Sequence, residues 1–528
     1  MANREELAII KGARAGQAKS QLALGKLYLL GSAGLPRSMP TALHWLDRAA
    51  RQDVAEAWIL IGANISFDVA SQSTEPIAQW YERAFDCGVV QAGLVLAQLV
   101  LGRHDDGGAR ELRAKALRSL ESAAQAGLAD AQWLLAQHGA ASDHANRAPV
   151  PEREGRSGPT RNESGPEWLA RAADSGVAQA QFAVLERAWE VQDWAGFVRR
   201  ALPLARALAL SAPASSETGK ASNGHLTPDE VQLLARCAQL LANGPIAHAV
   251  EPAEIQRFWE LAAQENERSA QLALGLWHAR MAPDGSRAAG GPASANFKRA
   301  IRWLTMAGEQ GLAAAWYALS RIFLKPEFSQ RSVAEAQIFL ERAAEIGHCG
   351  AQFECGSNAW RARRDHPGND VRAAYWLQKA AAQGSAEALN LLKKVAPQVS
   401  TPAWVATLAH LRLRDLMSSN PFLAARIELA AVFQLSRAEA LLLDVGAADR
   451  GHCLVVDISA SYGRSKRRLV LLHTAQERQA LDRIVKLFED VDCGPAGPEG
   501  NYRQRLYRLR TLLPGVQLAP DGDETGPG

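Results

Sequence analysis

The chain has 528 residues, of which 47% are hydrophobic and 22% are charged, and its formal net charge at pH 7 is +3. This length exceeds a single compact core, and the composition is that of a folded chain rather than a disordered one. So small a net charge excludes a protein coated with basic residues for nucleic acid or a membrane surface. No apolar run is long enough to span a bilayer, and the run at 7–10 is too short for a signal peptide, so we expect a protein without either.

One motif recurs eight times from residue 45 onward, and we call its first position the anchor. The anchors are Trp45, Trp80, Ser119, Trp168, Phe258, Trp303, Phe339 and Trp376. Four residues later stand Ala49, Ala84, Ala123, Ala172, Ala262, Ala307, Ala343 and Ala380. Eight residues after the anchor stand Asp53, Gly88, Gly127, Gly176, Asn266, Gly311, Gly347 and Gly384. Twelve residues after it stand Ala57, Ala92, Ala131, Ala180, Ala270, Ala315, Ala351 and Ala388.

Each column of this motif has a physical interpretation. An aromatic residue and an alanine four positions later lie on one helix face, where the small alanine lets a neighbouring helix approach closely. The position eight after the anchor is restricted to Gly, Asn and Asp, which best tolerate the left-handed backbone that ends many helices. The second alanine then falls at the start of another helix. Each copy is therefore predicted to be a helix, a tight cap and a second helix.

The spacing of the copies predicts a repeat architecture. Neighbouring anchors are 35 to 49 residues apart, except for one gap of 90 residues that we interpret as two units with one divergent copy. Such periods are typical of solenoids, and the helical pattern predicts an α-solenoid. The step from cap to second helix never varies, so all inserts are predicted to follow the second helix. The segments 139–166, 211–228 and 282–296 are rich in Gly, Ser, Pro and Ala and are predicted to be flexible.

The motif Trp-Leu-x-x-Ala-Ala-x-x-Gly-x-Ala-x-Ala, as at 376–388, resembles the Sel-one-like repeat family, whose members are relatives of tetratricopeptide repeats. The resemblance covers about residues 4–396. It implies a right-handed α-solenoid of tetratricopeptide-like helix pairs. It further implies a non-enzymatic scaffold or adaptor that binds a protein or peptide partner on its curved surface.

The repeat stops near residue 396, and residues 402–514 are predicted to form a small α/β module. Helices are expected at 402–417, 420–434, 436–445, 475–490 and 502–512. Two strands, at 452–459 and 467–473, are expected to form a hairpin because they are rich in branched apolar residues around a short polar turn. The tail at 515–528 is predicted to be disordered.

Residues 430–473 of this module resemble the first half of a tyrosine-recombinase catalytic domain. Arg437 and Lys466 fall near the arginine and the lysine of that family. A later His-x-x-Arg box is missing, since the last histidine is His473, and without it the charge that develops in phosphoryl transfer has no clamp. We therefore exclude recombinase activity. A degenerate relative remains the alternative, as a DNA-associated accessory protein.

A basic cluster in the predicted hairpin provides candidate nucleic-acid contacts. It consists of Arg464, Lys466, Arg467 and Arg468, and it is accompanied by Arg503, Arg505, Arg508 and Arg510 of the last predicted helix. Residues 401–514 carry 16 basic and 12 acidic side chains, a surplus of only four. A solvated hairpin tip is therefore the favoured interpretation, and phosphate binding is the alternative.

The remaining residue types predict no catalytic or metal chemistry. The six cysteines include no Cys-x-x-Cys pair, and the twelve histidines include no pair at the helical spacing of metal ligands. A Gly-x-Ser-x-Gly nucleophile motif is missing. We expect no enzymatic activity, no metal and no cofactor, and reduced thiols in a cytoplasmic protein. Most of the fourteen tryptophans are expected in the core.

Overall fold

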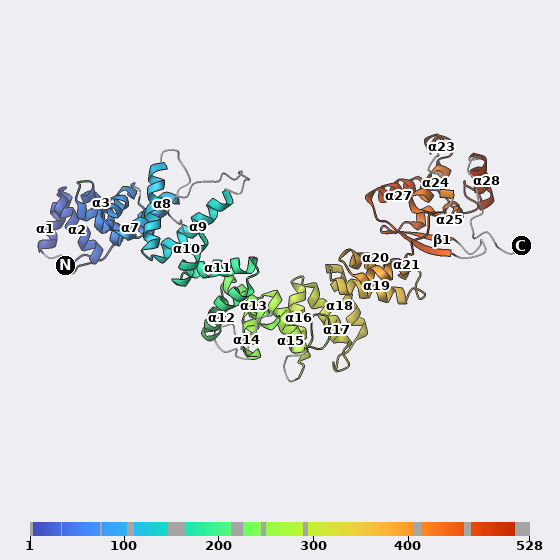
Figure 1. The fold of residues 1–528 in the computed structure, drawn as a ribbon, viewed down its shortest axis with the longest axis horizontal. Coiled ribbons are helices and arrows are strands. Elements are labelled where there is room, and N and C mark those ends of the chain that lie inside the picture. Colours follow the sequence, from blue (N-terminus) through green and yellow to red (C-terminus); the bar gives the residue numbers. More distant parts are fainter. Residues whose placement is uncertain are drawn as a thin grey trace, which may run out of the picture. The chain divides into compact units, whose positions relative to one another are not determined.

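The structure is a computed structural model (Figure 1). It describes residues 4–32, 34–73, 76–102, 110–145, 165–212, 225–243, 250–288, 294–402, 404–405, 413–458 and 466–512. The chain divides into two compact units, Met1–His248 and Ala249–Gly528. Among the described helices, none is long and apolar enough to cross a membrane.

The first unit consists of helices in the part of the chain that is described. They are α1 (Arg4–Arg14), α2 (Ala18–Leu30), α3 (Met39–Ala50), α4 (Ala55–Asn64), α5 (Phe67–Ser71), α6 (Ala78–Asp86), α7 (Val90–Leu101), α8 (Arg110–Gln125), α9 (Ala129–Ala145), α10 (Gly165–Asp174), α11 (Ala178–Glu190), α12 (Trp194–Ser211) and α13 (Pro228–Asn243). Apart from the short α5, consecutive helices form pairs, as the sequence predicts.

The second unit continues the helix pairs and ends in a small module with two strands. The pairs are α14 (Pro252–Gln264) with α15 (Arg268–Ala279), α16 (Phe297–Glu309) with α17 (Ala313–Leu324), α18 (Val333–Ile346) with α19 (Cys349–Arg361), and α20 (Asn369–Ala382) with α21 (Ala386–Val395). The module contains α23 (Leu413–Ser419), α24 (Pro421–Phe433), α25 (Arg437–Leu442), α26 (Val445–Ala448), β1 (Cys453–Ile458), β2 (Lys466–Leu471), α27 (Ala475–Leu487) and α28 (Tyr502–Leu512). This arrangement confirms a mainly helical array of helix pairs with a small sheet near the C-terminal end.

The aligned columns coincide with the joints between the paired helices. Every alanine four or twelve residues after an anchor is buried, with at most 1% of its surface exposed. The eight residues between them all have positive φ, from 56° at Asp53 to 119° at Gly347. In the last joint the N–H of Ser385 donates to the carbonyl of Ala380 at 3.2 Å, which closes the end of α20. A ninth joint, at Gly16 (φ 87°), connects α1 and α2 without an aromatic anchor.

The 90-residue gap between anchors holds one additional helix pair, α12 and α13. The prediction that every insert follows the second helix of a pair is wrong here, because 211–228 falls between α12 and α13. The tight connection lies instead between α11 and α12. There Gln192 has a φ of 61°, and the Asp193 carboxylate caps α12 by accepting the N–H of Gly196 at 2.9 Å.

The three predicted inserts are described only in part, since 146–164, 213–224 and 289–293 lie outside the described residues, as does the tail at 513–528. The described start of the 282–296 insert forms a hydrogen-bonded turn. Met281 and Arg287 form an isolated antiparallel bridge, and the N–H of Ala282 donates to the carbonyl of Ser286 at 2.9 Å.

Glutamines thirteen residues after the anchor position hydrogen-bond across the joint, and four of them, Gln21, Gln132, Gln271 and Gln352, are buried and also bond to the next pair. In five pairs the glutamine amide donates to a carbonyl eight residues earlier, from Gln21, Gln132, Gln181, Gln271 and Gln352. Gln352, for example, donates to the carbonyl of Ala344 at 3.0 Å and accepts from Gln383 of the next pair at 2.8 Å. Because buried polar groups are costly when unpaired, such a chain of amides favours one relative position of neighbouring pairs.

Tryptophan replaces this glutamine in two pairs, and stacking then takes the place of the amide bond. The ring of Trp58 stacks on the anchor Trp80 of the next pair, with centroids 6.2 Å apart. Trp316 stacks on the anchor Phe339 with centroids 5.6 Å apart. At this position two pairs contact the next one through aromatic rings instead of a glutamine amide.

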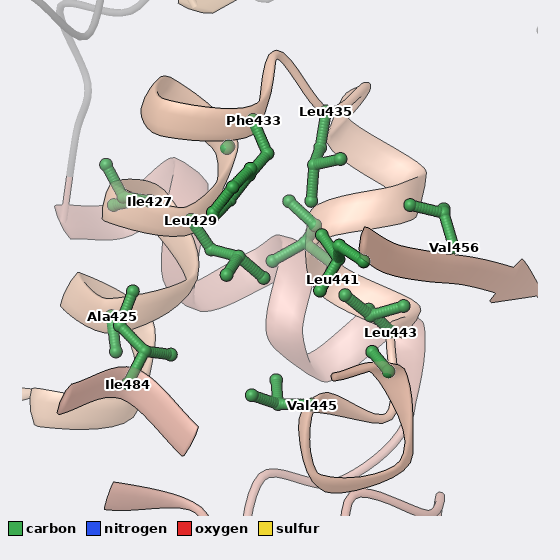
Figure 2. Packing of buried hydrophobic residues seen from close by; sticks show 14 of the residues in the cluster. Ala425, Ile427, Leu429, Phe433, Leu435, Leu441, Leu443, Val445, Val456 and Ile484 are labelled. Carbon is green, nitrogen blue, oxygen red and sulfur yellow. The ribbon is translucent and has the colours of Figure 1, made fainter. Parts of the chain in front are cut away.

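The C-terminal module has its own core. β1 pairs antiparallel with β2, and Cys453 lies opposite Leu471. Figure 2 shows Leu429 and Phe433 of α24 in a cluster with Leu441, and this cluster also includes residues of α27 and α28. Beside this cluster, Arg426 is buried and makes an ion pair with Glu499, with its Nε 2.7 Å from Oε1. Two backbone carbonyls also accept from this guanidinium, so each of its three nitrogens makes at least one hydrogen bond.

The module packs directly on the last helix pair. Cys453 and Leu469 of the hairpin share a buried cluster with Ala374 and Leu377 of α20. The His452 ring adds a polar contact, with Nε2 3.0 Å from the carbonyl oxygen of Val371. The two sequence regions on either side of residues 396–402 therefore share one apolar core within the second unit.

Candidate protein-binding surface

Five repeats carry an exposed cation three residues after the anchor. These cations are Arg48, Arg83, Arg171, Arg342 and Lys379. Residues three apart lie on the same side of a helix, so each cation sits beside its anchor. The alanine one position further on faces the neighbouring helix and is buried. The helix thus directs the packing residue inward and the cation outward. We call these five residues the cation column.

Each member of the cation column lies over a tryptophan ring. The guanidinium of Arg48 is 5.5 Å from the centre of Trp45, and that of Arg171 is 5.0 Å from Trp168. Lys379 lies 5.6 Å from the ring of Trp376. A cation over an indole face is attracted by the ring quadrupole, by about 0.5–1 kcal/mol at exposed sites. The rings therefore hold these exposed cations in place, and Arg83 also pairs with Asp53 at 3.0 Å.

Two members of the cation column also lie over the stacked tryptophans Trp58 and Trp316. Arg83 lies 5.1 Å from the ring of Trp58 and 5.3 Å from that of Trp80, and Arg342 lies 5.2 Å from Trp316. The Nε1 of Trp80 donates to Asp47 of the preceding pair at 2.8 Å, which fixes the ring that supports Arg83. The same aromatic contact thus joins two repeats and positions a surface cation.

A second polar cluster lies between α17 and α19. The hydroxyl of Tyr317 donates to Glu354 at 2.8 Å, Glu354 pairs with Arg321, and the ring of His348 stacks on Tyr317 at 4.3 Å. Burial raises the pKa of Tyr317 to about 12 and lowers the pKa of His348 below its usual value. The Nδ1 of His348 accepts the N–H of Ala351 and so caps α19. Each polar group here has a structural partner, so the cluster connects two pairs.

Comparison with known proteins identifies the repeats. The family model of the Sel1 repeat matches residues 18–54, 269–312, 313–348 and 351–385. These four segments are Sel1 repeats. Three members of the cation column, Arg48, Arg342 and Lys379, fall inside these matched segments. The comparisons do not show the resemblance of 430–473 to tyrosine recombinases.

Two solved structures are similar to the chain. One is c5321, a protective antigen present in uropathogenic Escherichia coli strains and displaying an SLR fold, with 18% identity, coverage of 100% of both chains and a TM-score of 0.39. The other is a Sel1 repeat protein from Oxalobacter formigenes, with 20% identity, coverage of 75% of this chain and 91% of that one, and a TM-score of 0.24. No curated protein sequence matches the chain.

The structure places the predicted repeat residues in the joints. Among the anchors, Trp80, Trp168 and Trp376 are buried, whereas Trp45 and Trp303 are partly exposed. The cation column and the glutamines occupy fixed positions of the recurring motif, three and thirteen residues after the anchor. Neither column is invariant, so neither stood out by residue identity alone.

The predicted nucleic-acid contacts lie on and beside β2, after the Sel1 repeats. Arg464 and the side chain of Lys466 lie outside the described residues. Arg467 pairs with Asp370 of α20 at 2.8 Å and with Asp457 of β1 at 3.0 Å. Arg468 also makes an ion pair with a carboxylate. Both arginines of the cluster whose side chains are described are therefore already paired with acidic residues.

Arg468 makes a two-pronged pair with Glu439, with its Nε and Nη2 each 2.8 Å from a carboxylate oxygen. Arg437, which fell near the recombinase arginine, is buried with 1% of its surface exposed. In α28, Arg505 is also buried and donates to the carbonyl of Leu441 at 2.7 Å. The guanidinium groups of Arg468 and Arg505 therefore make their contacts within the module.

Metal binding is not indicated in the described part of the chain, where no three His, Cys, Asp or Glu side chains are grouped as ligands. All six cysteines are free thiols. Burial raises the pKa of Cys355 and of Cys453 to about 12. Thiols with so high a pKa are protonated at neutral pH, and the thiolate is the nucleophile, so these two are packing residues.

Proposed function

We propose that this protein is a non-enzymatic scaffold that binds a protein or peptide partner on the surface of its Sel1 repeats. The observation that carries the proposal is the cation column, whose members are exposed and lie over tryptophan rings. Tryptophan and arginine are the residue types that most often dominate the binding energy of protein interfaces. Sel1 repeats commonly mediate protein interactions.

The stacking also gives a physical reason for binding. Ordering a long, flexible side chain on association costs about 0.5–1.5 kcal/mol. A cation that already rests on an indole ring loses less freedom when a partner arrives. Its positive charge selects partners that present acidic side chains.

We further propose that the protein works in the cytoplasm. Six free cysteines in a chain of this length support a reducing compartment, since secreted chains usually pair such residues. Quantitative thiol labelling of the protein in intact cells tests this. Six unmodified thiols are expected, and a disulfide found in the native protein would contradict it.

A comparison of full-length variants tests partner binding. The double variant Arg342→Ala/Lys379→Ala removes two members of the cation column, and Arg364→Ala removes an exposed arginine outside it. Each chain is used as bait in cells that express it, and captured proteins are quantified against the unmodified chain. We expect the partner to fall at least about tenfold with the double variant and to remain with the control. Equal capture by both variants would contradict the proposed surface.

A further inference from the structure

The outer edge of β2 in the C-terminal module has no strand partner among the described residues. β2 pairs with β1 only. The N–H of Leu472 donates to the carbonyl of His452 at 3.2 Å, so these opposed residues form a hydrogen-bonded pair. In an antiparallel ladder such pairs alternate with non-bonded ones. The backbone groups of Arg467, Leu469 and Leu471 therefore point away from β1, toward the free edge.

This edge lies in a groove rather than on an open surface. The groove has a volume of about 630 Å³ and is lined along β2 by residues 468–471. One wall is formed by Leu389 and Lys393 of α21 and by the segment that follows α21. The other wall is formed by Val432 and Phe433 at the end of α24. Exposed strand edges are templates for a further strand, and most proteins cover them.

The walls of the groove limit which molecules can reach the outer edge of β2. One face of β2 is covered by the last helix pair, since Leu469 is buried there with 2% of its surface exposed. The other face is covered by the module core, against which Val470 packs. Access remains only along the edge, between the two walls. A second copy of this hairpin is enclosed by the same walls, so it cannot approach edge to edge. A single extended peptide fits.

The side chains in the groove indicate the chemistry of that peptide. Leu389 and Val399 line it and are 47% and 45% exposed, which suits apolar side chains from alternate positions of a strand. Lys393 makes no ion pair with a described residue. The Glu477 carboxylate already accepts the N–H of Thr474 at 3.1 Å. The carboxylate of Glu477 keeps its negative charge, so an acidic side chain of the peptide is complemented at the α21 wall, where Lys393 lies.

We propose that this groove binds an extended segment of a partner protein with alternating apolar and acidic side chains, which adds to β2 as a third strand. The site differs from the cation column, because it uses the module and the end of α21. It is a second binding site on the same chain, and its test does not depend on the first.

A fluorescein-labelled peptide tests the proposal on the full-length chain. The probe has seven residues that alternate valine with aspartate or threonine. Its matched control carries methyl groups on alternate backbone nitrogens, which removes the donors of one strand edge. We expect the probe to bind, as measured by fluorescence anisotropy, and the methylated peptide to bind at least about tenfold more weakly. Equal binding of the two peptides, or no binding of the probe at millimolar concentration, would overturn the proposal.

Variants locate the site without disturbing the fold. Lys393→Glu and Val399→Asp change exposed lining residues. Each is expected to weaken probe binding at least about fivefold. The double variant Arg342→Ala/Lys379→Ala should bind the probe normally, which separates this site from the array surface. Hydrogen exchange should show protection of the amides of Leu469 and Leu471 on binding. Protection elsewhere, or a dimer that Lys393→Glu dissociates, would show that the groove does not take a peptide strand.

Discussion

Arg467 of β2 holds Asp370 of α20 with two hydrogen bonds, from Nε to Oδ2 at 2.8 Å and from Nη2 to Oδ1 at 3.0 Å. The same guanidinium donates to the carbonyl of Pro367 at 2.9 Å. These bonds connect the C-terminal module to the last helix pair beside their shared apolar core. Arg467, which the sequence suggested as a phosphate contact, therefore attaches the C-terminal module to the last helix pair.

Arg467→Ala should loosen this attachment. We expect a loss of about 1 kcal/mol in the free energy of unfolding of the second unit, since the pair is partly exposed. A double-mutant cycle with Asp370→Ala, measured by urea unfolding of the full-length chain, checks it. A coupling energy of about 0.5 kcal/mol or more is expected for residues in contact. Strictly additive effects would show that the pair contributes nothing.

Ala380→Leu should overpack the last joint. Ala380 is fully buried between α20 and its neighbours, and added methylene groups in a packed core cost about 1–3 kcal/mol. Ala382→Leu, two residues away on an exposed position, is the matched control and should change stability little. The melting temperatures of the two variants test this prediction. Equal melting temperatures would argue against close packing at this column.

Gly384→Val should destabilise the same joint for a different reason. The φ of Gly384 is 92°, and a Cβ there would meet nothing within 4 Å, so the penalty is one of backbone conformation. We expect a loss of about 1–2 kcal/mol. Gly384→Asn should cost clearly less, because Asn266 occupies the same place with a φ of 64°. Chemical denaturation compares the two, and similar losses would point to side-chain volume instead.

Gln352→Leu should weaken the connection between the last two pairs. The change removes both hydrogen bonds of this side chain, while the carbonyl of Ala344 keeps the N–H of Gly347 and the amide of Gln383 keeps the carbonyl of Gly347, so we expect a loss of about 1–2 kcal/mol. Gln383→Ala alone should cost less, since Gln383 is exposed. Hydrogen exchange of α19 and α20 should become faster in the first variant. Unchanged exchange would mean that apolar packing alone sets the position of these pairs.

Asp449 should make the module sensitive to acid. Two hydrogen bonds from Arg478, from Nη1 at 2.8 Å and from Nη2, hold the pKa of Asp449 below its ordinary value. A depressed pKa in the folded state contributes stability above the unfolded pKa of about 3.9. That stability is lost as the pH falls through the folded pKa. Urea unfolding between about pH 6 and pH 3 should therefore show a smaller decline for Asp449→Asn than for the unmodified chain. Parallel declines would exclude this contribution.

The joints of the array could be predicted from the sequence because their causes are local. The need for positive φ at Gly384 and for a small side chain at Ala380 depends on residues only four to eight positions apart, and residue type alone expresses both. Repetition of these short-range requirements then predicts stacked helix pairs. The pair α12 and α13 was not recognised from the sequence motif because an insert replaces the joint between its two helices.

Tertiary structure alone decided the partners of the charged groups and the site at β2. Arg467 and Asp370 are 97 residues apart, and an arginine suits a carboxylate as well as a phosphate. Which anion it meets depends on where the hairpin docks. The free edge of β2 likewise became a groove only because α21 and α24 cover its two sides. Sequence determines which elements form, whereas the docking of elements distant in the chain determines which side chains remain available to bind.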